Sequence, residues 1–259
     1  MAFLVVKIGN TSSVAALYEG GRVFRCMRLL RGGQSAAAVR SCIRSVAGGR
    51  CVTRAAVCSV VPALTRAWVA AAGEMSCGDV LKVSADVEVG VNLRRYPRPR
   101  TLGADRLANL AALAARGKFP AMAIDFGTAT VFDVVNRHRE YIGGVIAPGL
   151  PLMTEYLAKR TAQLPMLKAG RQTGTIGRST RGAMQIGATV GYRGLVREIL
   201  AHLEIDAGIF QMHVCATGGY AARVLKTMHL QCDQDPHLTL RGIGRILELN
   251  PAIDRRARS

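Results

Sequence analysis

Two short segments of the chain have the residue types and spacing of a phosphate-binding turn. They run from Val5 to Thr11 and from Ala123 to Thr130. Each has an apolar run, one charged residue, one apolar residue and a glycine, and then a hydroxyl-bearing turn before a second apolar run. Such a turn presents backbone N–H groups and Thr hydroxyls to an anion, most often phosphate. The pair predicts a duplicated domain with a nucleotide held between its halves.

The charged residue differs between the two segments, because Lys7 stands in the first where Asp125 stands in the second. Asp125 ends an apolar strand, and a carboxylate there costs free energy unless it meets a cation or hydrogen-bond donors. Two interpretations stay open for it: a hydrogen bond to the Gly-Thr turn that follows, or a metal or cation ligand. Thr128 lies in that turn and could contact phosphate, whereas Thr130 could be only a strand former.

A third motif, the sequence Gly-Ala-Asp-Arg at residues 103–106, opens a helix. Asp105 falls in its first turn, where the helix dipole favours a carboxylate, so capping alone would explain it. The irregular segment before the motif offers a second interpretation, because it carries residues suited to gripping a small anion: Tyr96, Arg98 and Arg100. In that setting Asp105 would lie beside a bound substrate and take a proton from a hydroxyl nucleophile.

Two further glycine motifs stand where strands lead into helices. The segment from Gly143 to Gly149 permits close approach of a ligand or of a neighbouring backbone. The tripeptide from Thr217 to Gly219 suits contact with a nucleotide at a helix N-terminus. The sequence has no G-x-x-x-x-G-K-[ST], and no G-x-G-x-x-G opens a helix after a strand, which argues against P-loop and Rossmann folds.

The elements that must position these motifs occur twice in the same order. For the first half we predict strands at 3–9, 13–18 and 22–28, a helix at 34–46, a strand at 55–61, a helix from Pro62, a strand at 80–83 and a helix at 104–116. For the second half we predict strands at 121–126, 131–135 and 140–146, a helix after Pro148-Gly149, a Gly-rich loop (Gly170, Gly174 and Gly177), a helix at 179–204, a strand at 213–216, a helix at 221–228 and a last helix around 244–249. The layout predicts a duplicated α/β fold with halves at residues 1–117 and 118–259.

Composition limits the class of protein. The chain has 259 residues, of which 49% are hydrophobic and 20% charged, as expected for a globular protein with a substantial core. No apolar run approaches the ~20 residues of a membrane helix, and the N-terminal run is a poor signal peptide. The seven scattered cysteines form no CxxC pair, which predicts reduced, buried thiols in a cytoplasmic protein rather than a disulfide framework or a zinc site.

The net charge of +18 is uneven along the chain. Residues 1–66 hold ten Lys or Arg against the single acidic Glu19. Such a surface could bind nucleic acid, or it could reflect a generally Arg-rich composition and attraction for anionic substrates. Aromatic residues are scarce, at 5%, and no nucleic-acid motif is present, so we favour the second interpretation.

Taken in order, the motifs resemble those of the type III pantothenate kinases. The resemblance covers nearly the whole chain and includes Gly9–Thr11, Ser59–Pro62, Gly103–Arg106, Asp125–Thr130, Gly143–Gly149, the region of Thr180 and Thr217–Gly219. This family belongs to the superfamily of acetate and sugar kinases, actin and heat-shock ATPases. The resemblance therefore implies a duplicated ribonuclease-H-like (actin-like ATPase) fold, with the nucleotide cleft between two similar halves.

The resemblance also implies an activity, which is ATP-dependent phosphorylation of pantothenate to 4'-phosphopantothenate, the first step of coenzyme A biosynthesis. Asp105 would be the general base. The substrate-binding residues would be Tyr96, Gly103, Ala104, Asp105, Arg106 and Thr180. Thr180 would reach the substrate from the partner subunit, which implies a homodimer.

The same resemblance implies which residues bind the nucleotide and its ions. The ATP-binding residues would be Lys7, Ile8, Gly9, Asn10, Thr11, Ser12, Ser13, Val14 and Thr128. Asp125 would bind a monovalent cation, K⁺ or NH₄⁺, and Mg²⁺ would accompany ATP.

The sequence departs from the family at the first turn. The family's motif begins with Asp where this chain has Lys7, and Ser12 replaces a usual Asn. Lys7 could contact phosphate directly as a point charge. The alternative is a catalytically weakened or inactive homologue that acts as an ATP- or DNA-binding regulator.

Overall fold

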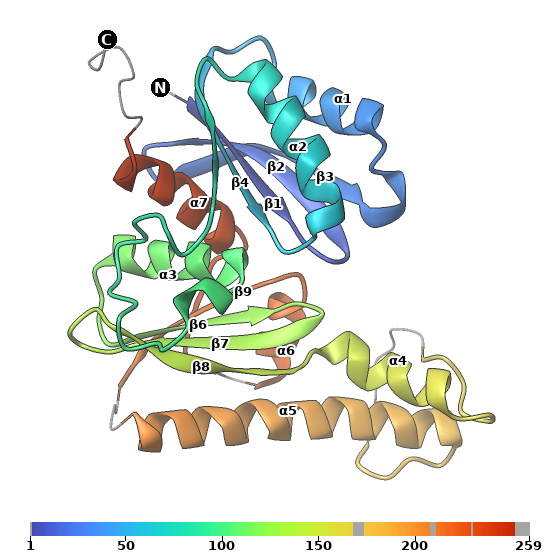
Figure 1. The fold of residues 1–259 in the computed structure, drawn as a ribbon. Coiled ribbons are helices and arrows are strands. Elements are labelled where there is room, and N and C mark those ends of the chain that lie inside the picture. Colours follow the sequence, from blue (N-terminus) through green and yellow to red (C-terminus); the bar gives the residue numbers. More distant parts are fainter. Residues whose placement is uncertain (1, 168–173, 208–210, 229, 252–259) are drawn as a thin grey trace. The chain divides into compact units, whose positions relative to one another are not determined.

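Two mixed β-sheets of the same topology organise the computed structural model, which describes residues 2–167, 174–207, 211–228 and 230–251 (Figure 1). Within these residues the sheets have the orders β3-β2-β1-β4-β5 and β8-β7-β6-β9-β10. In each, the central strand pairs antiparallel with the strand that follows it and parallel with the strand on its other side, β4 or β9. This correspondence confirms the predicted duplicated α/β fold.

Two compact units contain these sheets. The first takes in the chain up to Lys118, the short segment His138–Ile142 and the chain from His237 onward, and the second takes in the remainder. The first unit is therefore built from three separate stretches of sequence. The boundary between duplicated halves at residues 117 and 118 stays a prediction.

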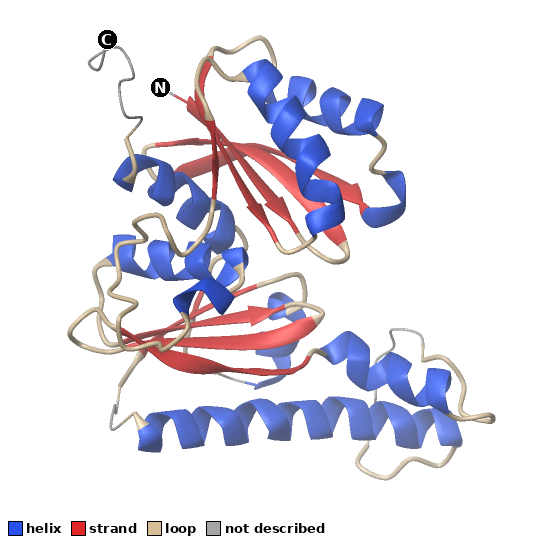
Figure 2. Cartoon of the chain, in the orientation of Figure 1, coloured by secondary structure: helices blue, strands red, loops and turns tan. Residues whose placement is uncertain are grey.

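The first unit contains the helices and strands from the N-terminus to α3, and α7. They are β1 (Ala2–Ile8), β2 (Ser12–Glu19), β3 (Arg22–Leu30), η1 (Arg31–Gly33), α1 (Ala36–Ala47), β4 (Val52–Ser59), α2 (Pro62–Met75), β5 (Val80–Lys82), η2 (Pro99–Thr101), α3 (Ala104–Arg116) and α7 (Leu238–Leu249). Figure 2 shows α1 and α2 together on one face of the sheet. Leu4, Val6 and Ile8 of β1 pack in the core on that face. Because side chains alternate along a strand, Val5 and Lys7 face the opposite side, where β1 contacts α7.

Helix α7 packs closely against the rest of the first unit through two glycines. A Cβ at Gly242 would overlap the carbonyl of Ala108 in α3, and a Cβ at Gly244 would overlap the ring of Tyr18 in β2. The sequence predicted only the last part of this helix, near residues 244–249, whereas it begins at Leu238. The earlier start places Thr239 in the first turn of α7, beside β1.

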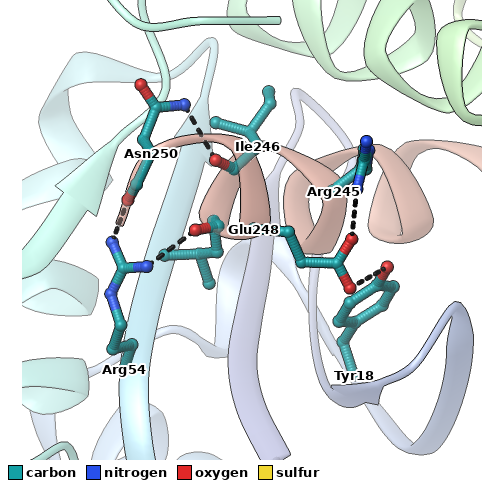
Figure 3. A network of polar contacts seen from close by, with 7 residues as sticks. Tyr18, Arg54, Arg245, Ile246, Glu248 and Asn250 are labelled. Carbon is teal, nitrogen blue, oxygen red and sulfur yellow. Dashed lines mark hydrogen bonds and ion pairs between the residues drawn. The ribbon is translucent and has the colours of Figure 1, made fainter. Parts of the chain in front are cut away.

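Polar contacts fix the last turn of α7 to the sheet (Figure 3). The guanidinium of Arg54 donates to the carbonyls of Leu247 and Asn250 at 2.6 and 2.5 Å. The hydroxyl of Tyr18 donates to the carboxylate of Glu248 at 2.9 Å. A cation at the carbonyl end of a helix satisfies acceptors that have no partner within the helix. These bonds hold the end of α7 against β2 and β4.

The second unit contains the repeat of the fold. Its elements are β6 (Ala121–Phe126), β7 (Ala129–Val135), most of β8 (Tyr141–Pro148), α4 (Leu150–Arg160), α5 (Thr180–Asp206), β9 (His213–Thr217), α6 (Ala221–Met228) and β10 (Asp233–Gln234). Every residue of β6 is buried, as expected for the central strand of a covered sheet. Gly170 of the predicted Gly-rich loop lies outside the described residues. None of the described helices is both long and apolar enough to cross a membrane.

The cysteines correct one prediction. None of the seven, which all lie in the described residues, forms a disulfide, and Cys42, Cys58 and Cys215 are buried as expected. Three others are exposed: Cys26, Cys51 and Cys77. The prediction of burial was wrong for these three because Cys26 lies on the edge strand β3, and the other two flank β4 and α2 rather than lying within them.

Candidate functional site

The turn between β1 and β2 is the first predicted phosphate-binding segment. The N–H of Gly9 donates to the carbonyl of Ser12 at 3.1 Å, which closes the turn and leaves Asn10 and Thr11 exposed. Arg31 lies behind it: its N–H donates to the carbonyl of Thr11 at 3.1 Å, and its guanidinium donates to the carbonyl of Asn10 at 3.2 Å. The turn therefore combines an exposed hydroxyl with a neighbouring cation, both favourable to an anion.

Arg31 was not among the predicted site residues. An arginine at this position does not indicate a site by itself, because so many residues of the segment are basic. Its position follows from the pairing of β2 with β3, in which Ser12 lies opposite Leu30, the residue before Arg31. Only this register brings Arg31 back to the turn.

Other members of the first segment support the turn from within the core. Ile8 is 1% exposed and packs on the α1 and α2 face of the sheet. The hydroxyl of Ser13 is buried and donates to the Gln34 side-chain oxygen at 2.8 Å. That oxygen also accepts the indole N–H of Trp68 at 2.9 Å. Ser13 and Ile8 therefore hold the turn in place through the core.

Lys7 lies on the opposite face and is held by a buried hydrogen-bond network. Its Nζ donates to the hydroxyl of Thr239 at 3.1 Å, and that hydroxyl donates to the side-chain oxygen of Asn109 at 2.9 Å. Thr239 and Asn109 are 3% and 1% exposed and come from α7 and α3. The network fixes the ammonium group one residue before the strand ends.

Asp105 occupies the first turn of α3. Gly103 is the residue at the N-terminal cap and makes no side-chain capping bond. Instead Asp105 Oδ1 accepts the N–H of Arg106 at 2.9 Å, and a Cβ at Gly103 would lie 2.7 Å from the same oxygen. The carboxylate thus lies over Gly103 and accepts an N–H of the first helical turn. This bond agrees in part with the interpretation that Asp105 caps the helix. A carboxylate has about four lone-pair sites, so one hydrogen bond to the backbone is compatible with a role as proton acceptor.

Arg106, Tyr141 and Tyr96 form one cluster in the first unit. The guanidinium of Arg106 donates to the hydroxyl of Tyr141 at 2.5 Å and lies 5.9 Å from its ring centroid. The rings of Tyr141 and Tyr96 are 5.3 Å apart and tilted by 47°. Tyr141 is fully buried, so it positions the two predicted substrate residues. The sequence analysis did not predict Tyr141 as a site residue, since its only signal is an aromatic residue two positions before Gly143-Gly144.

A pocket of about 400 Å³ lies against the start of α3. The ends of β4 and β5 and the loop before α3 line it, with polar groups from Ser59, Ser84, Asp86 and Arg100 beside Gly103. Its size and mixed lining suit a small polar molecule. A larger hollow of about 670 Å³ is lined by Ala85, residues 87–94, Pro99, His138 and Arg139, and we assign it no role.

In the second unit, Asp125 ends β6 between two glycine turns. It is 9% exposed. Gly127 follows it, and a Cβ there would lie 3.6 Å from Asp125 Oδ1. Gly218 has φ +96°, and a Cβ there would overlap both Asp125 Oδ1 and the carbonyl of Phe126. Only glycine therefore leaves space beside these two oxygens. No group of three or more His, Cys, Asp or Glu that could hold a metal occurs among the described residues.

Thr128 stands at the tip of the second turn and is exposed. Its carbonyl accepts the N–H of Gly149 at 3.0 Å, and a Cβ at Gly149 would overlap that carbonyl. The carbonyl of Phe126 accepts the N–H of Tyr220 at 3.0 Å. The turn after β6, the start of α4 and the turn after β9 thus meet where the parallel strands β6 and β9 end. In open α/β sheets ligands bind at this edge.

Two more predicted residues lie elsewhere in the second unit. Thr130 is fully buried, and its hydroxyl lies 2.6 Å from that of Tyr192 on α5. Burial raises the pKa of Tyr192, so this pair is neutral and structural. Thr180 is exposed as the first residue of α5, where the hydroxyl of Ser179 accepts the N–H of Gly182 at 3.1 Å.

Solved structures with the same fold define the class of protein. A protein described as a Baf family transcriptional activator from Campylobacter jejuni matches 97% of this chain and 100% of its own at a TM-score of 0.60 and 16% identity. A ROK family glucokinase from Streptomyces griseus, solved with glucose and AMPPNP, matches 94% of this chain and 98% of its own at a TM-score of 0.52 and 11% identity. At such identities these likenesses show the fold alone. The chain has the actin-like ATPase and sugar-kinase fold.

The sequence comparisons narrow the class to one family. The model of the type III pantothenate kinase family matches residues 3–202. A type III pantothenate kinase from Akkermansia muciniphila is 43% identical over 199 residues, which cover 76% of this chain and 78% of that protein. A type III pantothenate kinase from Dehalococcoides mccartyi is 35% identical over 260 residues, and the match covers 96% of this chain and 98% of that protein. The chain therefore belongs to the type III pantothenate kinase family and is a kinase. Nothing in these comparisons favours the alternative of an inactive regulator.

Proposed function

We propose that the protein transfers the γ-phosphoryl group of ATP to the primary hydroxyl of pantothenate, which gives 4'-phosphopantothenate, the first step of coenzyme A biosynthesis. The family of the chain supports this activity. The structural observation that carries it is the pocket lined by Gly103 and Ala104, because it lies at the start of the helix whose first turn holds Asp105 and Arg106. Asp105 offers a carboxylate and Arg106 a cation to the same small molecule.

The substrate-binding step follows from the charges. Pantothenate carries a carboxylate, and the guanidinium of Arg106, which Tyr141 orients, is a planar fork of N–H donors whose geometry suits a carboxylate. We assign the hydroxyl proton to Asp105, which accepts it as the oxygen attacks phosphorus. The dipole of α3 favours the charged form of a carboxylate in the first turn, which is the form that acts as a base.

We assign the binding of ATP phosphates to the two turns. The N–H groups and hydroxyls of Gly9–Thr11 and the hydroxyl of Thr128 donate to phosphate oxygens, and Arg31 and Lys7 add positive charge near the first turn. Phosphoryl transfer depends on positioning and charge stabilisation more than on covalent help. Fixed donors and cations of this kind are what the reaction requires.

Asp125 is our proposed ligand for a monovalent cation, K⁺ or NH₄⁺. The support is the pair of oxygens, Asp125 Oδ1 and the carbonyl of Phe126, which both lie against Gly218, because hard cations prefer oxygen ligands. Such an ion, together with the Mg²⁺ that accompanies ATP, supplies neutralising charge to the phosphates. With the ion absent, Asp125 would still order the turns that carry Thr128 and Gly218.

We also propose a homodimer in the cytoplasm, in which Thr180 serves the partner subunit's substrate. Exposed apolar side chains on α4 and α5 support a subunit contact: Leu152, Tyr156, Leu157 and Val190. The free cysteines fit a reducing compartment. Light scattering on the purified protein tests the dimer, and a monomer at micromolar concentration would contradict it.

A coupled assay of ADP release tests the activity. ADP should appear only when pantothenate and ATP are both present, and the product should gain one phosphate by mass. Asp105→Asn keeps the shape of the side chain and removes the base, so kcat should fall about 10²–10⁴-fold while folding is preserved. Pantothenate-independent ADP release, or full activity in Asp105→Asn, would contradict the proposed mechanism.

A further inference from the structure

Two exposed cysteines of the first unit lie side by side although 26 positions separate them in the sequence. Cys51 immediately precedes β4 and Cys77 follows α2 by two residues. Their sulfur atoms are 3.9 Å apart. The N–H of Cys77 donates to the carbonyl of Val52 at 3.1 Å, and Val52 forms a parallel bridge with Ser76. The backbone thus holds both residues together independently of their side chains.

This placement meets the requirements of a disulfide. A disulfide needs neighbouring backbones and sulfurs that approach to ~2.05 Å. Bridge-paired segments supply the first condition, and exposed side chains can rotate about χ1 to reach the second without disturbing the core. Cys42 illustrates the contrast, because it is 2% exposed and packs in the core on α1.

We propose that Cys51 and Cys77 are a reversible oxidation site, at which a peroxide converts the two thiols into one disulfide. The Cys51 thiolate attacks a peroxide oxygen, the O–O bond breaks, and Cys51 becomes a sulfenic acid. The Cys77 sulfur then attacks the Cys51 sulfur, the S–O bond breaks, and the oxygen leaves as water with the Cys77 proton. With hydrogen peroxide, two thiols are oxidised and one peroxide is reduced to two waters.

The order of the two steps follows from the contact between the sulfurs. The neighbouring Cys51 raises the pKa of the Cys77 thiol, so Cys77 keeps its proton and is the resolving residue. A partner within contact distance also intercepts the sulfenic acid before further oxidation. The disulfide is accessible to a reducing thiol because both residues are exposed.

The bond would tie the start of β4 to the end of α2. These elements connect through Ser59 and Val60, which line the pocket at the start of α3. Closing a loop of this length restricts the unfolded chain, and we expect the melting temperature of the oxidised protein to rise by roughly 5–10 °C. The first unit would gain stability under oxidising conditions without any change to its active-site residues.

Peptide mapping of the full-length protein tests the proposal directly. Trypsin cleaves after Arg50, Arg54, Arg66 and Lys82, which places Cys51 in residues 51–54, Cys77 in residues 67–82 and Cys58 in the peptide between them. After hydrogen peroxide and alkylation of the remaining thiols, the non-reduced digest should contain residues 51–54 linked to residues 67–82. Dithiothreitol should separate the two peptides and restore the original melting temperature.

Three variants make the result decisive. Cys51→Ser and Cys77→Ser should each abolish the linked peptide and the rise in melting temperature, and both should keep the kinase activity of the reduced protein. Cys26→Ser is the matched control, because Cys26 is exposed without this partner, and it should form the linked peptide as the wild type does. The proposal is overturned if the wild type gives no linked peptide, or if Cys51→Ser and the wild type lose equal numbers of thiols. This readout is covalent, so it stands apart from any failure of the proposed kinase activity.

Discussion

Lys7 is the position at which the chain departs from its family, and replacing it tests whether its charge serves catalysis. Lys7→Met removes the ammonium group and keeps a side chain of similar length. Lys7→Asp restores the acidic residue expected by resemblance. Both changes remove the hydrogen bond to Thr239, which lies 3.1 Å from Nζ, and leave the bond between Thr239 and Asn109.

The size of the effect follows from the position of the charge. Lys7 is half-buried and is fixed by buried polar groups one residue before the turn, so its charge acts in a medium of intermediate dielectric. An ammonium about 4 Å from a phosphate charge contributes about 4 kcal/mol at an effective dielectric constant of about 20. That energy is on the order of a thousandfold in rate. Partial exposure reduces it, and for Lys7→Met we expect kcat/KM for ATP to fall about 10²–10³-fold.

The assay is ADP release with pantothenate at saturation, over a range of ATP and Mg²⁺ concentrations. Lys7→Asp should change activity by orders of magnitude and should alter the Mg²⁺ dependence, because a carboxylate attracts the cation that the ammonium repels. Thr239→Val is the control, because it keeps the ammonium and removes the hydroxyl that bonds both Lys7 and Asn109. Urea unfolding shows which variants remain folded. If folded Lys7→Met and Lys7→Asp match the wild type in kcat/KM and in Mg²⁺ dependence, the charge has no role in the reaction.

Three further predictions concern the cluster, the cation site and the core. Arg106→Lys loses the planar fork that bonds Tyr141, so KM for pantothenate should rise about 10-fold or more, measured by the same assay. Gly218→Ala places a methyl group against Asp125, so it should abolish any stimulation by K⁺ and lower the melting temperature by several degrees. An unchanged response to K⁺ would contradict the cation site. Burial raises the pKa of Tyr18 to about 12, whereas a tyrosine of the unfolded chain has a pKa of about 10. Between these values the unfolded chain loses the phenol proton first. The free energy of unfolding should therefore fall by roughly 2 kcal/mol between pH 10 and 12. Urea unfolding at several pH values should show this loss in the wild type and not in Tyr18→Phe.

The fold and the position of the turns could be read from the sequence because both depend on local patterns. Glycine marks a turn by its conformational freedom, and apolar runs of strand length identify β1 and β6. Helix α3 begins and ends within a residue of its prediction, because Gly103 and Gly117 flank a regular apolar stripe. The early start of α7 escaped prediction because the helix is held by packing against Ala108 and Tyr18, far away in sequence.

The contacts that orient the site residues could not be predicted in the same way. Arg106 meets Tyr141 across 35 positions, and Lys7 meets Thr239 across 232. No local pattern encodes such pairs, since each depends on the register of strands and on helix packing. The same limit applied to Cys51 and Cys77, whose spacing fits no sequence motif but whose segments the fold brings together.

The duplicated fold also explains how a lysine can stand in the position of an aspartate. Lys7 on β1 and Asp125 on β6 are the second-to-last residues of equivalent central strands, and each pairs with a valine of the next strand, Val14 or Val131. The shared position directs each side chain off the sheet beside its turn, but the surroundings differ. The carboxylate of Asp125 lies against Gly218, whereas Lys7 donates to the hydroxyl of Thr239. We propose that the copy with Asp125 receives a cation, whereas the copy with Lys7 carries a positive charge as part of the chain, so that the two would neutralise phosphate charge by different means.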